Sequence, residues 1–186
     1  MACLAAELKK TIVLVGMMGA GKTAVGRALA DILAVPFLDS DDEITTAADM
    51  TIAEIFARDG EAFFRARETE VIARLLREKI GVLSIGGGAY LAQSNRELIS
   101  KSGVAIWLRA DENLLWSRVS RRDTRPLLRT ENPRQTLHEL CLAREPLYQK
   151  AELAVDCDAK YSIGNMAKRV VKAIKSRPDV LEMHNG

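Results

Sequence analysis

The stretch "TIVLVGMMGAGKT" (Thr11–Thr23) decides the fold. Its first five residues, Thr11–Val15, form an apolar, largely β-branched run that is typical of a buried strand. The run stops at Gly16, and from Lys22 to Leu33 the apolar residues recur at helical spacing. The sequence therefore predicts a strand, a glycine-rich turn and a helix in immediate succession.

The turn fits the pattern G-x-x-x-x-G-K-[ST] over Gly16–Thr23. Glycines let backbone N–H groups turn toward phosphate oxygens, and the amino terminus of the following helix adds positive potential. Lys22 contributes a point charge, and Thr23 offers a hydroxyl to Mg²⁺. A chance match is the alternative, but it would not require a strand before the turn and a helix after it. The expected phosphate-binding residues are Gly16, Gly19, Ala20, Gly21, Lys22, Thr23 and Ala24.

Beyond this stretch, short apolar runs alternate with longer helical patterns. Further strands are expected at 35–38, 82–85, 104–108 and 153–155. Helices are expected at 61–79, 96–102, 112–121, 134–149 and 162–175, with a shorter one that begins at the capping box of Thr51 and Glu54. Apolar strands separated by helices predict an α/β fold with a parallel sheet covered on both faces. The last stretch, 177–186, is expected to be frayed.

Length and composition limit the possible classes of protein. The 186 residues suit one domain, with a core at about 11–176, and 48% hydrophobic and 28% charged residues are ordinary for a soluble globular protein. A net charge of +2 gives no reason to expect a nucleic-acid partner. Three scattered cysteines favour a reducing compartment, and neither a leader nor an apolar run long enough for a membrane span is visible. A cytoplasmic protein without a membrane partner is expected.

Four acids stand among the five residues "DSDDE" (Asp39–Glu43), directly after the expected second strand. In an extended segment, Asp39 and Asp41 would face the same side because side chains alternate with a period of two. We therefore expect these two carboxylates to face the crevice at the end of the sheet. Asp42 and Glu43 are interpreted as ordinary residues of a solvated turn.

From about residue 11 to about residue 173, the chain resembles the shikimate kinase family. Six motifs carry the resemblance, in this order: GMMGAGKT, FLDSD (Phe37–Asp41), IFARDGEAFFRARE (Ile55–Glu68), GGG (Gly86–Gly88), RPLL (Arg125–Leu128) and REPLY (Arg144–Tyr148). The resemblance implies a three-layer P-loop kinase fold with five parallel strands in the order 2-3-1-4-5. It also implies a mobile lid at about 117–132 and a substrate-binding region at about 39–68.

The resemblance further implies an activity. The family transfers the γ-phosphoryl group of ATP to the 3-hydroxyl of shikimate, with Mg²⁺, in the biosynthesis of chorismate and the aromatic amino acids. Its members are typically monomers. Asp39 suits the Mg²⁺ shell, Asp41 suits the attacking hydroxyl, and Lys22 neutralises charge on the transferred group.

Basic residues complete the implied site. Arg65 and Arg144 match arginines that bind the substrate carboxylate, and a guanidinium can do so bidentately. Gly86, Gly87 and Gly88 leave room for backbone amides to approach the substrate. Arg125 matches the lid arginine, which closes over the phosphates, and Arg118 matches a residue that packs on the adenine.

Several residues keep two interpretations. Phe56 and Phe64 can wall the substrate ring or simply pack in a core. Glu68 either orients Arg65, three residues earlier, or forms a plain surface ion pair with it. Lys160 lies in the loop "DCDAKYS", where the family completes its adenine site, but the loop has no clear family pattern.

Two other functions remain as alternatives. One is a different small-metabolite kinase of the same fold, such as a gluconate or nucleotide kinase. The other is a non-catalytic P-loop regulator that binds ATP and a metabolite without turnover. A regulator would be expected to have lost Lys22, Asp41 or Arg125, and all three are present.

Overall fold

The strand predicted at Thr11–Val15, β2, lies at the centre of a five-stranded parallel sheet and is buried along its whole length. The computed structural model describes residues 6–121 and 126–183. The order of the sheet is β3-β4-β2-β5-β6, which over these five strands is the predicted order 2-3-1-4-5. The strands around β2 are β3 (Phe37–Asp39), β4 (Val82–Ser84), β5 (Gly103–Arg109) and β6 (Leu153–Asp156).

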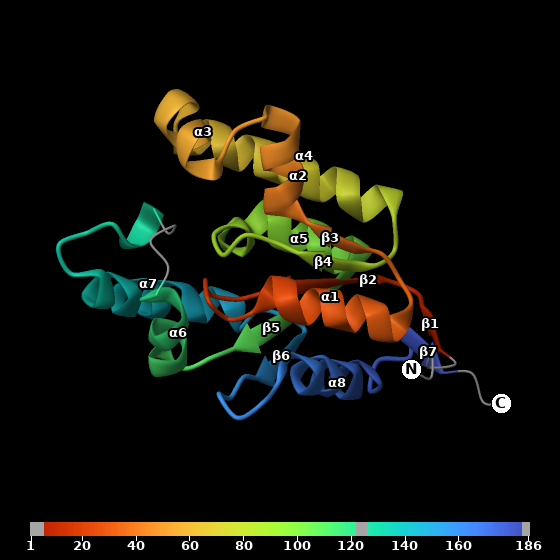
Figure 1. The fold of residues 1–186 in the computed structure, drawn as a ribbon. Coiled ribbons are helices and arrows are strands. Elements are labelled where there is room, and N and C mark those ends of the chain that lie inside the picture. The colour runs from red at the N-terminus through yellow and green to blue at the C-terminus, as the bar shows by residue number, and fades with distance from the viewer. Residues whose placement is uncertain (1–5, 122–125, 184–186) are drawn as a thin grey trace.

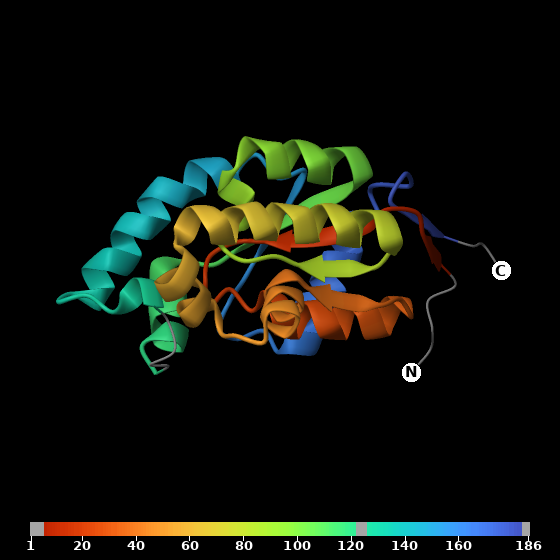
Figure 2. The same cartoon turned by 90° about the horizontal axis from the view of Figure 1, so that it is seen from above.

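Helices cover both faces of this sheet. Helices α1 (Lys22–Leu33) and α8 (Ile163–Ile174) pack together on one face. Helices α4 (Glu61–Glu78) and α5 (Gln93–Ser102) lie on the other, as Figure 2 shows from above. The α/β fold with a covered parallel sheet is therefore confirmed, and α1 has the bounds that its periodicity predicted.

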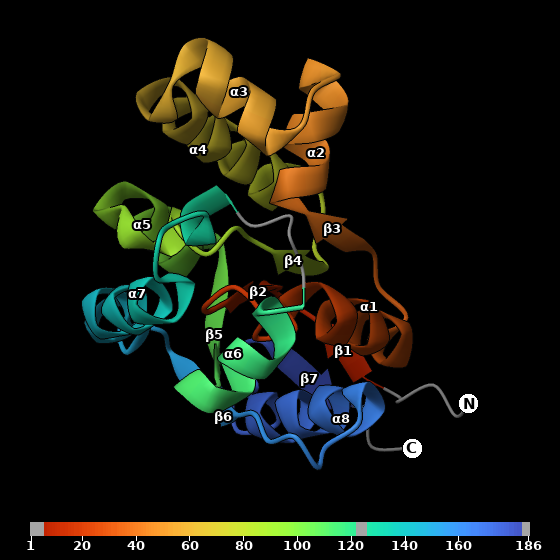
Figure 3. The same ribbon diagram turned by 60° about the vertical axis from the view of Figure 1, so that its left-hand side comes forward.

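Three further helices and two short turns gather beyond the carboxyl ends of the strands. They are α3 (Ile52–Asp59), α6 (Glu112–Val119), α7 (Pro133–Tyr148), and the short 3₁₀ turns Ala89–Leu91 and Pro126–Leu128. The capping box that starts α3 is present, because Glu54 N donates to Thr51 Oγ1 at 3.2 Å and Thr51 N donates to Glu54 Oε2 at 2.7 Å. Figure 3 shows α3 at the top and α8 at the bottom, with the sheet between them.

The acidic stretch is a helix start, so the prediction of an extended turn is wrong. Helix α2 runs over Ser40–Ala48, and Asp39 is its N-cap, with a side chain that accepts from the backbone N–H groups of Asp41 and Asp42. Carboxylates at the N-cap and in the first turn are stabilised by the free N–H groups and the dipole of a helix. The acids after Asp39 therefore follow helical geometry, and the alternation argument does not apply to them.

The chain end that was expected to be frayed contains a strand. Strand β7 (Leu181–Met183) pairs antiparallel with β1 (Ala6–Leu8), and the pair Leu8↔Leu181 is buried. The β1–β7 ribbon lies beyond the end of the sheet opposite α6 (Figure 1).

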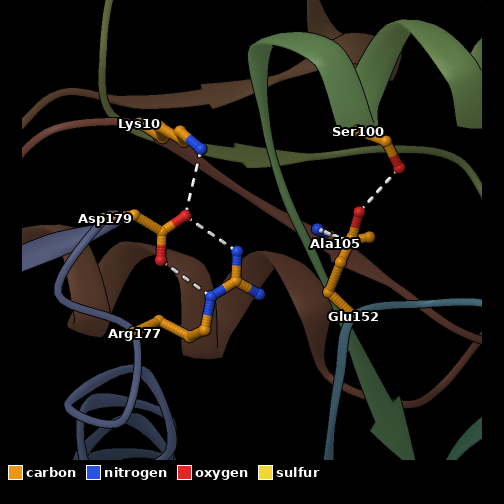
Figure 4. Close-up of polar contacts among 6 residues, drawn as sticks. All are labelled: Lys10, Ser100, Ala105, Glu152, Arg177 and Asp179. Carbon is orange, nitrogen blue, oxygen red and sulfur yellow. Dashed lines mark hydrogen bonds and ion pairs between the residues drawn. The ribbon is translucent and has the colours of Figure 1, made fainter.

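Ion pairs and a partly buried acceptor, Glu152, tie neighbouring segments together (Figure 4). Asp179 accepts from Lys10 Nζ at 3.0 Å and from two nitrogens of Arg177 at 2.8 Å each. Glu152 accepts from Ser100 Oγ at 2.6 Å and from the backbone N–H of Ala105 at 2.7 Å. The pairing of β5 with β6 begins only one residue later, at Ile106↔Leu153. The Glu152 side chain therefore accepts from the N–H of Ala105, where β6 provides no backbone partner.

Buried apolar residues form two clusters of unequal size. The larger cluster runs through the sheet and its helices, from Leu8 to Leu181. The smaller cluster holds Ile44, Ile55 and Phe64, which join α2, α3 and the start of α4. Within residues 6–121 and 126–183, no helix combines the length and the apolar character needed to cross a lipid bilayer.

Candidate active site

The glycine-rich turn has the backbone geometry that its pattern predicted. Gly16, Gly19 and Gly21 have φ values of 143°, 82° and 92°, which favour glycine over any residue with a side chain. A Cβ atom on Gly16 would also lie 2.9 Å from the carbonyl oxygen of Leu108. Gly21 then caps α1, so the turn presents the amino terminus of that helix to the cavity above it.

That cavity has a volume of about 640 Å³ and extends away from the turn. Lys22 lies in it, and its Nζ donates to the carbonyl oxygens of Gly16 and Met17 at 2.8 and 3.1 Å. Arg118, from the last turn of α6, donates to the carbonyl oxygen of Gly19 at 3.0 Å. The predicted phosphate-binding residues 19–24 all line this cavity, and Arg118 lines it with them.

The first cavity is also lined by Cys157, Tyr161, Ile163 and Met166. Tyr161 was missed by the sequence reasoning, which considered Lys160 instead. Lys160 pairs with Asp158 at 3.0 Å and does not line the cavity. The ring of Tyr161 has the guanidinium of Arg169 at 4.4 Å and the ammonium of Lys160 at 5.3 Å. The sequence signal that could have identified Tyr161 is an aromatic residue in the loop after β6.

Thr23 and Asp39 meet beside the phosphate loop. Thr23 Oγ1 donates to Asp39 Oδ2 at 2.9 Å, while Asp39 Oδ1 accepts from the backbone N–H of Asp41 at 3.0 Å. Both are hard oxygen donors, and this pair fits Mg²⁺, which binds few protein groups and keeps several waters. Over the described residues, no group of three or more His, Cys, Asp or Glu side chains could hold a metal ion by itself.

A second cavity, of about 600 Å³, opens on the other side of Asp41. Its walls come from α3, α4, the Gly86–Gly88 segment, the 3₁₀ turn at Pro126–Leu128 and α7. Met18, Asp41, Gly86 and Gly87 line both cavities. The two cavities therefore meet at Asp41.

Burial and neighbouring charges shift the pKa of Asp41, some upward and others downward. Burial raises its pKa above the usual range and the negative charge of Asp39 raises it further, while Lys22 and Arg65 lower it. Its position in the first turn of α2 places it at the carboxyl edge of the sheet, where folds of this kind hold their ligands. The geometry gives it access to groups bound in either cavity.

Arg65 and Glu68 form a close pair one turn apart on α4. Arg65 Nη1 donates to Glu68 Oε2 at 2.7 Å. The side chain of Glu68 is only 1% exposed, so the interpretation as a surface ion pair is wrong. Burial raises the pKa of Glu68 to about 6, although the pairing with Arg65 opposes that rise. Glu68 Oε1 lies buried in the cavity wall without a hydrogen-bond partner among the described residues.

The three glycines leave space for close approach by side chains, and none of them has a positive φ. A Cβ atom on Gly88 would lie 2.4 Å from Arg65 Nη2, and one on Gly87 would lie 3.2 Å from Arg144 Nη1. Arg144, from α7, is 6% exposed. Two guanidinium groups from distant parts of the chain therefore converge on one glycine segment at the second cavity.

Phe56 and Phe64 serve as both wall and core. Their ring centroids are 4.8 Å apart, and both line the second cavity. Phe64 also belongs to the small buried cluster with Ile44 and Ile55. The packing interpretation is therefore confirmed, and the role of both rings as a wall for the substrate ring stays a prediction.

The arginine-rich loop contributes residues that the sequence reasoning did not single out. Leu127 and Arg129 line the second cavity. Arg125, which was expected to close over the phosphates, lies outside the described residues. The loop was recognised by its composition, but composition alone could not say which of its arginines borders the substrate side.

Comparison with known proteins agrees with this geometry. The shikimate kinase family model matches residues 18–175. A shikimate kinase of Ruegeria pomeroyi is 62% identical over 96% of this chain and 92% of its own length, and one of Cereibacter sphaeroides is 60% identical over 95% and 88%. The solved structure of the Acinetobacter baumannii shikimate kinase in complex with shikimate is 41% identical, with a TM-score of 0.86 over 90% of this chain and 93% of that one. The chain belongs to the shikimate kinase family.

Proposed function

We propose that this protein transfers the γ-phosphoryl group of ATP to the 3-hydroxyl of shikimate and releases shikimate 3-phosphate and ADP. The observation that carries the proposal is the meeting of two cavities at Asp41, one with a phosphate loop and one with paired guanidinium groups. Relatives that are 60% identical or more over most of the chain are shikimate kinases, so the rival kinase and regulator functions are not favoured.

ATP binds in the first cavity in this proposal. Its phosphates contact the backbone of the turn, formed by Gly16, Gly19, Ala20, Gly21, Lys22, Thr23 and Ala24, at the amino terminus of α1. The Lys22 ammonium, which lies over the carbonyls of Gly16 and Met17, moves to the phosphate oxygens and balances their charge. Arg118 and Tyr161 border the base, and Arg125 covers the phosphates.

Thr23 would hold Mg²⁺, and Asp39 would hold it through water. When bound, the ion neutralises negative charge on the phosphates. The hydrogen bond from Thr23 to Asp39 keeps both oxygens beside the phosphate loop, and the capping bonds of Asp39 to α2 fix the carboxylate.

Shikimate binds in the second cavity. Arg65 and Arg144 bind its carboxylate, because two guanidinium groups offer an anion several convergent N–H donors. Glu68 keeps Arg65 oriented by their 2.7 Å bond. Gly86, Gly87 and Gly88 let the ring approach the backbone, while Phe56 and Phe64 wall its apolar side.

Asp41 carries the chemistry where the two substrates meet. Its carboxylate accepts a hydrogen bond from the 3-hydroxyl and orients the attacking oxygen toward the γ-phosphorus. As the new O–P bond forms and the bond to the β-phosphate oxygen breaks, the hydroxyl proton passes to Asp41 and ADP leaves with the bonding electron pair. Lys22 and Arg125 stabilise the charge that spreads over the transferred group.

The proposed organisation is one domain over residues 1–186, with a core at about 11–176. A lid at about 117–132 closes over ATP, and the substrate-binding region covers about 39–68. The protein acts in the cytoplasm as a monomer, without a nucleic-acid or membrane partner. The continuous buried cluster from Leu8 to Leu181 supports a single folding unit.

The activity is tested by a coupled assay of ADP release. Shikimate, gluconate and a nucleoside monophosphate are offered separately with ATP and Mg²⁺, and only shikimate should give turnover above background. Chelation of Mg²⁺ by EDTA should stop that turnover, and added Mg²⁺ should restore it. Faster turnover with gluconate or a monophosphate would contradict the proposal.

A further inference from the structure

Tyr148, the last residue of α7, lies beneath the junction of the two cavities. Its side chain is 1% exposed, and its hydroxyl donates to the carbonyl oxygen of Gly87 at 2.6 Å. The same hydroxyl lies 3.9 Å from Met17 Sδ in the phosphate loop. The Tyr148 ring stacks on Trp107, with ring centroids 6.1 Å apart and an interplanar angle of 29°.

The bond to Gly87 sets the direction of a peptide plane. In a trans peptide unit the C=O and the following N–H point in opposite directions, and none of the peptide bonds in the described residues is cis. With the carbonyl of Gly87 held by Tyr148, the N–H of Gly88 points away from Tyr148. The carbonyl, which would repel a carboxylate, cannot then turn into the cavity that Gly87 and Gly88 line.

The Arg144 guanidinium lies near the same hydroxyl, because a Cβ atom on Gly87 would be 3.2 Å from Arg144 Nη1 and 3.6 Å from the Tyr148 hydroxyl. Burial raises the pKa of Tyr148 to about 12, although the positive charge of Arg144 opposes that rise. The phenol therefore keeps its proton, and it can donate to Gly87 and accept from Arg144 at once. One buried hydroxyl thus binds the glycine segment and lies beside an arginine of the second cavity.

We propose that Tyr148 is a positioning residue for the acceptor substrate. It holds the Gly87–Gly88 peptide and the Arg144 guanidinium in the arrangement that receives the carboxylate of shikimate. This inference rests on the proposed function, which assigns that cavity to shikimate. Tyr148 itself lines neither cavity and therefore acts through the groups that it holds.

Replacement of Tyr148 by phenylalanine tests the inference, because Tyr148→Phe removes the hydroxyl and keeps the ring. The buried carbonyl of Gly87 loses its partner and Arg144 loses its acceptor, so the KM for shikimate should rise about tenfold. The KM for ATP should stay within about twofold, and the stacked ring should keep Tm near that of the wild type. Shikimate binding measured by calorimetry should weaken in parallel with the KM.

Tyr90 provides a matched control. It is equally buried, lies two positions after Gly88, and its hydroxyl makes no hydrogen bond to the described residues. Tyr90→Phe should leave both KM values unchanged.

Three results would overturn the inference. An unchanged KM for shikimate in Tyr148→Phe would show that the hydroxyl positions nothing. An equal rise of both KM values together with a large fall in Tm would show a merely structural role. A wild-type enzyme without shikimate turnover would overturn the proposed function and this inference with it, whereas the first two results would leave that function intact.

Discussion

The two cavities of this enzyme are built in different ways. In the first cavity, proposed above as the nucleotide cavity, the part proposed to bind phosphate is one continuous turn that offers backbone N–H groups at the start of α1, and other stretches of chain line the rest. The second cavity, proposed above as the shikimate cavity, takes Arg65, Asp41 and Arg144 from three different helices. A phosphate site can therefore be encoded locally, whereas recognition of a small carboxylic acid depends on how distant elements pack.

The support beneath the two cavities differs as well. The turn between β2 and α1 packs within the large buried cluster that runs through the sheet. The wall of the shikimate cavity that α3 and the start of α4 form packs on the small cluster, whose buried residues are Ile44, Ile55 and Phe64. Regions with few buried apolar contacts open at lower free-energy cost. We therefore expect the shikimate side to move while the nucleotide side stays in place.

The largest expected effect is at Asp41, where the two cavities meet. Asp41→Asn should lower kcat about a thousandfold, since the amide cannot accept the hydroxyl proton. ATP affinity, measured by titration calorimetry, should change little because the phosphate loop is untouched. Asp42→Asn, whose side chain is 69% exposed on the same helical turn, is the control and should keep full activity. A joint loss of turnover and ATP binding in Asp41→Asn would mean that Asp41 supports the loop instead.

Truncations in the two clusters test the difference in support. Leu29→Ala, in the large cluster, should lower the free energy of unfolding by about 3 kcal/mol because it leaves a cavity in a rigid core. Ile55→Ala, in the small cluster, should lower the global value less, since α3 can detach without the rest unfolding.

Urea unfolding, hydrogen exchange and substrate kinetics together measure this contrast. Ile55→Ala should speed exchange in α3 and raise the KM for shikimate several-fold, with the KM for ATP unchanged. Equal global losses and no difference between the two KM values would show that both cavities belong to one equally rigid unit.

The smallest expected effect is a pH dependence from Glu68. Burial raises its pKa from 4.5 to about 6, so the folded protein holds this proton more tightly than the unfolded chain. Its contribution to stability is fully present below pH 4.5 and is lost as pH rises through 6, a change of about 2 kcal/mol. Glu68→Gln lacks this titration. Its free energy of unfolding should therefore rise relative to that of the wild type as pH increases from 4.5 to 7.

Urea unfolding of both proteins across this pH range provides the measurement. Glu70 is an exposed residue on the same helix, so the free energy of unfolding of Glu70→Gln should change with pH as that of the wild type does. A difference between Glu68→Gln and the wild type that does not vary with pH would show that the Glu68 carboxylate is not desolvated.

The sequence predicted those features that are encoded within one stretch of chain. The five central strands, α1 and the glycine geometry of the phosphate loop follow from periodicity and motif. Helix α2 was missed because four acids resemble a solvated turn, whereas the first of them is an N-cap that stabilises a helix.

Features that depend on packing could not be predicted in this way. The sequence left two interpretations of Glu68 open, because a glutamate three positions after an arginine can orient it or form a surface ion pair, and only the position of α4 over the second cavity buries it. The contact of Tyr148 with Gly87 joins positions 61 residues apart. The roles of Arg125, Arg144 and the other site residues stay predictions that the variants above can test.

The β1–β7 ribbon has a consequence for how the chain acquires its structure during translation. Lys10 and Asp179, which flank its two strands, are 169 positions apart, and the paired residues Ala6 and Met183 lie farther apart still, so the ribbon is the most non-local contact among those described for the molecule. The amino-terminal part of a chain leaves the ribosome first. Strand β1 therefore has no partner while the sheet and the helices around the phosphate loop are synthesised. Closure of the ribbon is then a late event, and a ribosome stalled before β7 emerges should carry an assembled phosphate loop beside a β1 that is open to proteolysis.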